Sequence, residues 1–228
     1  MRRFGPGMLV AAAFIGPGTV TTASIAGANF GFVLMWALLL SIIVTFVLQE
    51  MSSRLGIVSG LGLSEALRSS INNHFLKAFL MILIVSALGI GNAAFEVGNI
   101  TGAAIGLSQI SNLSISSSVL IVGILVLILL GTRIFKMLEQ ILTVLVVIMS
   151  LLFLLTMITI EIDYSKLLRG LFIPTVTASS LLTIMALIGT TVVPYNLFLH
   201  ADASKTKWKD QEVTQALNNS RVDTAISI

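Results

Sequence analysis

The sequence predicts an all-α integral membrane protein. Hydrophobic residues make up 56% of its 228 residues and charged residues only 10%, whereas a soluble globular domain carries about 25% charged residues. Mean hydropathy is +1.03. Apolar stretches of roughly 20 residues, the length of a membrane-spanning helix, recur along the whole chain. The chain has no cysteine, which excludes disulfides, thiolate metal sites and cysteine nucleophiles.

Six stretches meet this length in order along the chain. The predicted spans cover residues 7–29, 31–50, 76–106, 117–136, 139–160 and 178–201. The third span is longer than one crossing requires and has room for a juxtamembrane turn. Residues 202–220 are polar and predict an amphipathic loop helix, and residues 221–228 have the pattern of a seventh span that is cut off.

The charged residues predict the orientation of these spans. If the N-terminus is cytoplasmic, only Lys166 and Arg169 of the 13 basic residues fall on the outer side, in agreement with the positive-inside rule. No small-residue cleavage site follows the basic start, so the first span is expected to be retained. Acidic residues, Asp223 among them, are expected in loops or at span ends, and Glu96 alone lies well inside a span. We therefore expect a multi-pass protein of the cell membrane with a cytoplasmic N-terminus.

Two of the spans contain residues that interrupt a helix. The first carries Gly16-Pro17-Gly18, and the sixth carries Pro194 within GTTVVPYN. Proline removes a backbone donor, and the two glycines beside it abandon the helix rather than bend it. Pro194 alone is equally typical of a simple kink. Unwound backbone survives in a bilayer only where protein or a water-lined cavity covers it, so two breaks near mid-membrane predict one shared cavity, as in an inverted-repeat transporter.

Several segments resemble a known transporter family. They are AAAFIGPGTVTTASIAGANFGFVLMWALLLS, LQEMSSRLGIVSGLGLSEALR, GLFIP, VPYNLFLH and NNSRVDT, and together they are similar to the Nramp (natural resistance-associated macrophage protein) divalent metal transporters. The resemblance implies a LeuT-type inverted-repeat fold and proton-coupled import of ions such as manganese and iron(II). It places the first five-helix repeat at residues 1–160, an extracellular linker at 161–177, and helix six, a cytoplasmic loop and the beginning of helix seven at 178–228. It also implies a missing C-terminal half of the transporter as a partner.

The sequence departs from the family pattern at the residues that ligate the metal. The family's Asp-Pro-Gly-Asn in helix one reads Gly16-Pro17-Gly18-Thr19 here, and its Met-Pro-His in helix six reads Val193-Pro194-Tyr195. Both changes remove side-chain ligands. The backbone carbonyls of Gly16 and Thr190 remain as candidate metal ligands. The residues expected to bind the substrate are Gly16, Pro17, Gly18, Thr19, Thr190, Val193 and Tyr195.

The proton or ion path implied by the resemblance is only partly retained. An acid pair of helix three corresponds to Glu96 and Asn99, so one carboxylate is replaced by an amide. His200 matches a family histidine. Glu96 and His200 each have an alternative interpretation. Glu96 could be a protonated acid that is hydrogen-bonded across a helix interface. His200 could be an interfacial hydrogen-bonding residue. On another face of the span that carries Glu96, a ridge of small residues predicts close helix packing. It consists of Ala94, Gly98, Gly102 and Gly106.

The remaining oxygen ligands predict a function. A thioether selects transition metals, whereas carbonyl and hydroxyl oxygens suit hard cations. We expect a secondary transporter of cations, above all divalent metal ions, with altered selectivity and incomplete proton coupling. Two alternatives stay open: a transporter of a small anionic or zwitterionic solute such as an amino acid, bound at the helix N-terminus near Thr19, and a non-transporting membrane scaffold or sensor. No nucleotide cradle, nucleophile elbow or metal-spaced His motif occurs, so no enzyme activity, cofactor or nucleic-acid partner is expected.

Overall fold

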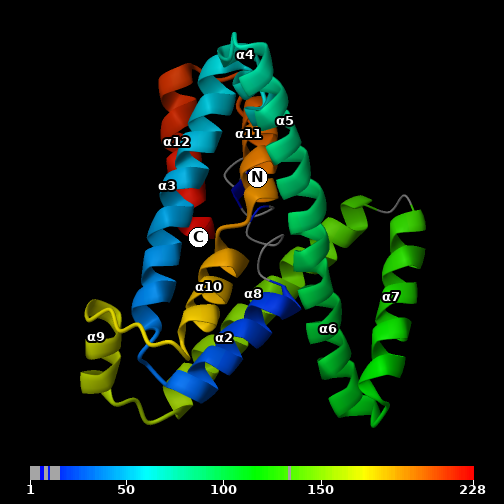
Figure 1. Ribbon diagram of the computed structural model, residues 1–228, viewed down its shortest axis with the longest axis vertical. Coiled ribbons are helices and arrows are strands. Elements are labelled where there is room, and N and C mark those ends of the chain that lie inside the picture. The colour runs from blue at the N-terminus through cyan, green and yellow to red at the C-terminus, as the bar shows by residue number, and fades with distance from the viewer. Residues whose placement is uncertain (1–5, 8–9, 11–15, 133–134) are drawn as a thin grey trace. The chain divides into compact units, whose positions relative to one another are not determined.

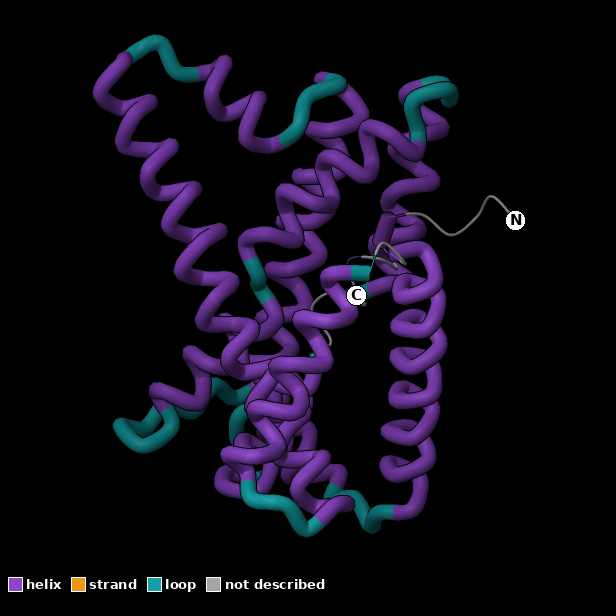
Figure 2. The backbone as a smooth tube through the Cα atoms, turned by 90° about the vertical axis from the view of Figure 1, so that its right-hand side faces the viewer, coloured by secondary structure: helices purple, strands orange, loops and turns teal. Residues whose placement is uncertain are grey.

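The described residues are almost entirely helical. The computed structural model describes residues 6–7, 10, 16–132 and 135–228, and Figure 1 and Figure 2 show helices joined by short loops, with no strand in this part of the chain. This confirms the all-α prediction. The elements are α2 (Pro17–Phe30), α3 (Met35–Ser59), α4 (Leu63–Ser70), α5 (His74–Ser86), the π-helical turn η1 (Ala87–Gly91), α6 (Asn92–Ser111), α7 (Ile115–Gly131), α8 (Phe135–Thr159), α9 (Tyr164–Phe172), α10 (Leu181–Thr191), α11 (Pro194–Lys207) and α12 (Val213–Ser227).

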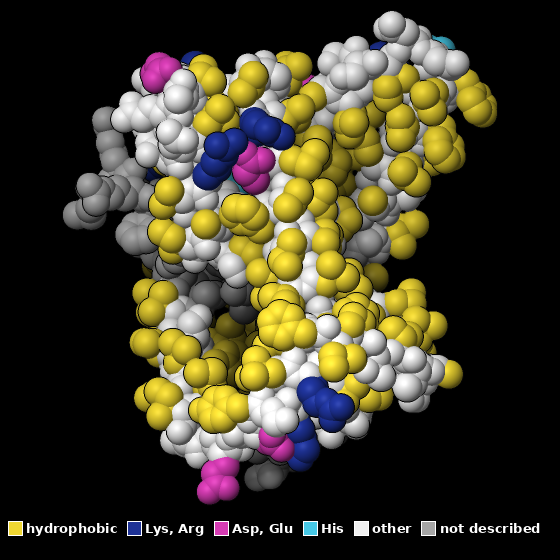
Figure 3. All heavy atoms as spheres, turned by 90° about the vertical axis from the view of Figure 1, so that its left-hand side faces the viewer, with side chains coloured by type: hydrophobic (Ala, Val, Ile, Leu, Met, Phe, Trp, Pro, Cys, Tyr) yellow, Lys and Arg dark blue, Asp and Glu magenta, His cyan; other side chains and the backbone are white. Residues whose placement is uncertain are grey.

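Several helices are long and apolar enough to cross a membrane. Among the described residues these are Met35–Ser59, the continuous run His74–Ser111 and the interrupted run Leu181–Lys207. Ile115–Gly131 and Val147–Thr159 are apolar but shorter. Part of the first predicted span, residues 8–9 and 11–15, lies outside the described residues. Figure 3 shows hydrophobic side chains over most of the face that it draws, with charged side chains in a few small groups. Such exposed apolar side chains are expected where lipid replaces water.

The chain forms two compact units. Unit 1 comprises Met1–Phe14, Ser41–Ala94 and Thr191–Ile228, and unit 2 comprises Ile15–Leu40 and Phe95–Thr190. Unit 2 has a hydrophobic core where α2, the start of α3 and α10 meet. Its buried members are Ala26, Leu34, Ala37, Ile184 and Leu187.

In unit 2, small residues bring α2 and α6 into close contact. A Cβ added to Gly102 would lie 2.8 Å from both the carbonyl carbon and the carbonyl oxygen of Pro17. A Cβ added to Gly18 would lie 3.0 Å from the carbonyl carbon of Gly98. Helix backbones approach this closely only where side chains are absent. The predicted packing role of the ridge is confirmed for Gly98 and Gly102, whereas Gly106 has no such neighbour within 4 Å.

In unit 1, polar residues rather than large apolar ones connect the helices. A buried stripe runs along α3 and consists of Ser41, Thr45, Gln49, Ser52 and Ser53. From it, Ser53 Oγ donates to Ser204 Oγ of α11 at 2.8 Å and is hydrogen-bonded to Ser220 Oγ of α12. Ser52 Oγ donates to the carbonyl of Leu197. Lipid provides no hydrophobic force that drives helices together, so inward-facing hydroxyls and close contacts hold such helices to one another.

The C-terminal part of the chain corrects two predictions. Residues 202–220 do not form a separate loop helix, because α11 continues to Lys207 and α12 begins at Val213. Asp223 was expected in a loop or at a span end, yet it lies inside α12, is buried, and accepts a hydrogen bond from the Gly7 amide at 2.7 Å. The physical reason is the polar face of α12, on which Ser220, Asp223, Thr224 and Ser227 are all buried.

Candidate functional site

The first predicted break ends at Gly16 on its C-terminal side, and the residues directly before Gly16 lie outside the described part of the chain. Gly16 is extended, with φ −113° and ψ 176°, and α2 begins at once with Pro17 in its first turn. Proline is well suited to this position because its missing N–H would be unpaired there anyway. The carbonyl of Gly16 accepts a hydrogen bond from the Val20 amide at 3.1 Å. Within the described residues, the predicted unwound stretch is therefore limited to Gly16, and its carbonyl is part of the helix start rather than freed.

Asn99 of α6 contacts the start of α2. A Cβ on Gly16 would lie 2.5 Å from Asn99 Oδ1, so only glycine allows the amide to come this close. The Gly18 amide donates to Asn99 Oδ1 at 3.3 Å, and Asn99 Nδ2 donates to Glu96 Oε2 at 3.4 Å. Glu96 is exposed and Asn99 half-buried. The arrangement connects the positive N-terminus of α2 to a carboxylate through one amide.

The end of α10 meets the same region of unit 2. Thr190 Oγ1 and Thr19 Oγ1 are hydrogen-bonded at 2.8 Å, and Thr190 is only 9% exposed. Four residues after Thr190 comes Pro194, which has no N–H. The carbonyl of Thr190 therefore lacks the donor that the next helical turn normally supplies. Two hydroxyl oxygens therefore meet at the junction of α2 and α10, and the Thr190 carbonyl belongs to the same end of α10.

The second predicted break is confirmed. Helix α10 ends at Thr191 and α11 begins at Pro194, with Val193 extended at φ −95° and ψ 120°. Val193 is 5% exposed and Tyr195 is half-buried. Both belong to unit 1, whereas Thr19 and Thr190 belong to unit 2. Their predicted role in substrate binding stays a prediction.

His200 lies in unit 1 in a buried polar environment. It is 1% exposed, and its Nδ1 donates to Gln49 Oε1 of α3 at 2.6 Å. This bond fixes the tautomer of the neutral imidazole and leaves Nε2 as an acceptor. Within the described part of the chain, His200 Nε2 has no hydrogen-bond partner. The same holds for the side-chain oxygen and nitrogen of Asn196 and for the hydroxyl of Thr45. A buried polar atom without a partner costs about 1–3 kcal/mol, so these atoms mark a place for water or a transferable proton.

Asn196 and Thr45 were not predicted as site residues, and Gln49 was not predicted to contact His200. A signal was present, because Thr45 and Gln49 are four residues apart on one helix, and Asn196 and His200 are four apart on the other. Residues at this spacing share a helix face. A search for polar stripes inside the predicted spans finds both pairs.

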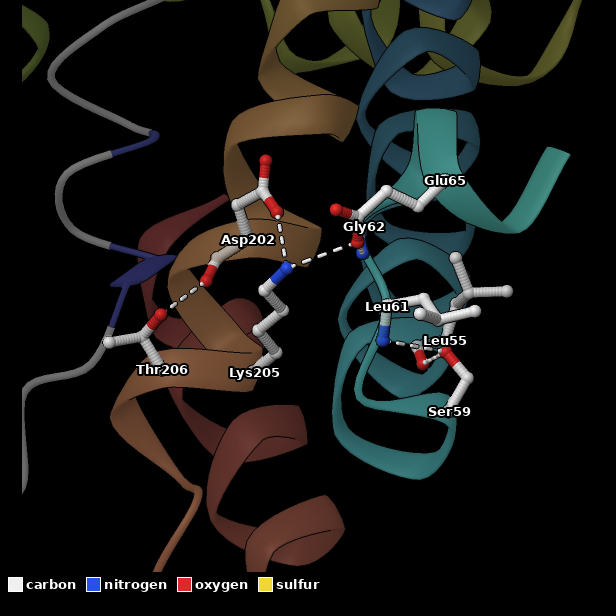
Figure 4. Close-up of polar contacts among 8 residues, drawn as sticks. All are labelled: Leu55, Ser59, Leu61, Gly62, Glu65, Asp202, Lys205 and Thr206. Carbon is white, nitrogen blue, oxygen red and sulfur yellow. Dashed lines mark hydrogen bonds and ion pairs between the residues drawn. The ribbon is translucent and has the colours of Figure 1, made fainter. Parts of the chain in front are cut away.

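An ion-pair cluster connects α4 to α11 in unit 1. Lys205 Nζ lies 3.3 Å from Glu65 Oε2 and 3.3 Å from Asp202 Oδ1, as Figure 4 shows. Glu65 Oε2 also accepts from the Gly62 amide at 2.9 Å. The Gly62 hydrogen bond, with a further contribution from Lys205, holds the pKa of Glu65 below its ordinary value of 4.5. The cluster connects α4 and α11 by charge, because one ammonium group contacts two carboxylates.

The candidate site contains no preformed set of metal-binding side chains. In the part of the chain that the structure describes, no group of three or more His, Asp or Glu residues could hold a metal ion. The oxygen atoms at the α2 and α10 junction come instead from hydroxyls and backbone. Such oxygens match the ligand preference of hard cations such as magnesium and calcium.

Comparisons with known proteins agree on one family. The model of a family described as natural resistance-associated macrophage protein-like matches residues 7–228. A divalent metal cation transporter, MntH of Latilactobacillus sakei, is 32% identical over 93% of this chain and 46% of its own length. Metal transporter Nramp5 of Oryza sativa is 31% identical over 86% of this chain and 36% of its own length.

A solved structure supports the same relationship. The crystal structure of a manganese transporter of Eremococcus coleocola, in complex with an aromatic bis-isothiourea substituted compound, has a TM-score of 0.71 and 27% identity to this chain. The match covers 98% of this chain and 47% of that one. This chain spans about half the length of the bacterial relatives that it matches.

Proposed function

The chain belongs to the Nramp family, and from this premise we propose that it takes part in moving divalent cations across a membrane. The family's fold, the LeuT type, agrees with the described helices and with the structural match. Its relatives are named as divalent metal cation transporters. The chain spans about half of their length. Its proposed transport activity and its proposed substrate therefore rest on the chemistry of its own residues.

The pair of hydroxyls at the α2 and α10 junction is the observation that supports this proposal. Thr19 Oγ1 and Thr190 Oγ1 lie 2.8 Å apart, and hydroxyl oxygens are ligands of the kind that hard cations bind. The C-terminal end of α10 adds the partial negative charge of a helix end. Thr190 belongs to this end, and its carbonyl receives no helical hydrogen bond from residue 194, because Pro194 has no N–H. A hard divalent ion that keeps part of its hydration shell fits this ligand set.

The same geometry disfavours the anionic solute. An anion at the start of α2 would need the exposed amides there, but the Gly18 amide already donates to Asn99 Oδ1. Behind that amide lies the Glu96 carboxylate, which is bonded to Asn99 Nδ2. A negative group in this position repels an anion and attracts a cation. Cation transport is therefore the function that we propose.

We propose further that the selectivity differs from that of a manganese carrier. A thioether discriminates in favour of transition metals, and Val193 and Tyr195 supply none. With oxygen ligands alone, magnesium should be carried at least as well as manganese. Gly16, Pro17 and Gly18 belong to the proposed binding region as the start of α2, the helix that carries Thr19.

The proposed proton or ion path consists of Glu96, Asn99 and His200. Its support is the hydrogen-bonded connection from Asn99 to Glu96 in unit 2 and the acceptor Nε2 of the buried His200 in unit 1. Proton acceptance by His200 would charge a group whose Nδ1 is already held by Gln49. The N-terminus is proposed to be cytoplasmic, on the charge distribution of the loops.

Uptake into proteoliposomes that contain the full-length protein tests the proposal. Magnesium, manganese, sodium and an amino acid are compared, with empty liposomes as the blank. We expect divalent uptake with magnesium at least equal to manganese, and a reduction in Thr190→Val. Thr183→Val, an identical change on the same helix, is the matched control and should transport normally. Uptake of the amino acid alone, or of no solute, would overturn the proposal.

A further inference from the structure

A basic pocket lies at the turn between α4 and α5 in unit 1, far along the chain from the oxygen-rich junction. Its cavity of about 340 Å³ is lined by Arg68, His74, Lys77, Ala78 and Met81. The two helices meet at a three-residue turn (Figure 1). Two permanent cations and an imidazole thus surround one hollow, and no acidic residue is among the lining residues.

The cations of this pocket lack the carboxylate partners that some basic residues of unit 1 have. Lys205 and Arg221 are paired with carboxylates at 3.3 Å and 2.9 Å. Arg68 and Lys77 form no ion pair with any residue that the structure describes. Lys77 is moreover half-buried, so its charge is partly removed from solvent and favours an anionic partner.

The chemistry of the pocket is that of a phosphate site. An arginine guanidinium binds a phosphate through two parallel hydrogen bonds, and a lysine acts as a point charge beside it. The N-terminus of α5 does not supply the binding groups, because the Asn73 side chain already accepts from the Phe75 and Leu76 amides at 2.9 Å and 3.2 Å. Recognition therefore depends on the side chains of Arg68 and Lys77.

The neighbouring face of α5 indicates where the rest of the ligand lies. Phe75 is 83% exposed, Phe79 54% and Ile82 67%, and their spacing puts them on one face of the helix. This apolar face begins at the same turn as the basic pocket. A free anion in the pocket would leave this apolar face uncovered. A lipid would occupy both, because its charged phosphate suits the basic pocket and its acyl chains suit the apolar face.

We propose that this pocket binds the phosphodiester headgroup of an anionic membrane lipid, with the acyl chains along Phe75, Phe79 and Ile82. Basic pockets between membrane helices on the cytoplasmic side hold such headgroups. Each Lys or Arg near the surface contributes about fivefold to the affinity for anionic lipid. Loss of both charges should therefore weaken binding roughly 30-fold.

Native mass spectrometry of the full-length protein, titrated with phosphatidylglycerol and with phosphatidylcholine, tests the proposal. We expect tighter binding of phosphatidylglycerol, a loss of about 30-fold in the double variant Arg68→Gln with Lys77→Gln, and little change for phosphatidylcholine. Arg68→Lys keeps the charge but loses the two parallel hydrogen bonds, so its affinity should fall between those of the unchanged protein and Arg68→Gln. Lys209→Gln removes the same charge from an exposed turn outside the pocket and should bind as the unchanged protein does.

Three results would overturn the lipid site. The first is equal phosphatidylglycerol affinity in the double variant, and the second is an equal loss in Lys209→Gln, which would reveal attraction by net charge alone. The third is full displacement of the lipid by millimolar inorganic phosphate, which would assign the pocket to the free anion. If the double variant does not elute as a monodisperse species, Lys77→Gln alone replaces it, with an expected loss of about fivefold.

Discussion

Adding one methyl group to Gly102 should disturb the start of α2. The ideal Cβ of an alanine there lies 2.8 Å from the carbonyl carbon and from the carbonyl oxygen of Pro17, and 3.0 Å from Pro17 Cβ. Two of these neighbours are backbone atoms, which cannot rotate away as a flexible side chain can. The first turn of α2 must then move by several tenths of an ångström, and overpacking of this kind costs about 1–3 kcal/mol.

Gly106→Ala is the matched comparison, because the same change is made one turn later on α6. A Cβ on Gly106 meets nothing within 4 Å. Alanine is a better helix former than glycine by about 0.8–1 kcal/mol, and this gain is shared by both variants. Subtracting one from the other therefore isolates the contact with Pro17. We expect Gly102→Ala to be less stable than Gly106→Ala by about 1–3 kcal/mol.

Thermal unfolding of the full-length protein in detergent, at one fixed scan rate, measures this difference. Cation uptake provides a second readout, since displacement of Pro17 also moves Gly18 away from Asn99. Gly106→Ala should unfold at or above the temperature of the unchanged protein and should transport normally. Equal unfolding temperatures and equal uptake in the two variants would refute the close approach of α2 and α6.

Two further predictions concern unit 1. Gln49→Leu leaves the buried His200 Nδ1 without its acceptor. It should destabilise the protein by about 1–3 kcal/mol and change the pH profile of uptake. Unchanged stability and an unchanged pH profile would show that Gln49 does not position His200. Glu65 has a lowered pKa in the folded protein because of Gly62 and Lys205, so its stabilising effect is present above the unfolded pKa and is lost as pH falls through the folded pKa. Glu65→Gln should therefore unfold more easily than the unchanged protein at pH 7, and the two unfolding temperatures should converge in acid; a constant difference at every pH would contradict this.

The sequence contained enough information for the fold class and for the break before Pro194. Composition and apolar length decide the fold class, because a chain this hydrophobic can satisfy its backbone in lipid only as helices or a closed barrel. The proline fixes the second break wherever the helix lies, since it lacks the N–H. At Pro17 and Gly18 the same reasoning predicted unwound backbone, but the structure has the first turn of α2 there, because proline starts a helix as readily as it ends one.

The contacts of the site depend on tertiary structure and could not be predicted. Thr19 and Thr190 were both expected to line the site, but their hydrogen bond depends on how α2 and α10 pack. Asn99 was assigned only to the proton or ion path, and its bond to the Gly18 amide depends on the glycine contacts between α2 and α6. Asp223 was misplaced because hydropathy averaged over a span hides a polar face on one side of a helix.

The central claim is that oxygen ligands at the α2 and α10 junction form a cation site. Calorimetric titration of the full-length protein with magnesium and with manganese tests this claim most directly. We predict affinities for the two ions within about tenfold of each other, because oxygen ligands discriminate weakly between them. Thr190→Val should weaken both, and Thr183→Val neither. Two results would contradict the account. The first is manganese binding that is more than about a hundredfold tighter than magnesium binding, which only a softer ligand set would explain. The second is unchanged binding of both ions in Thr190→Val.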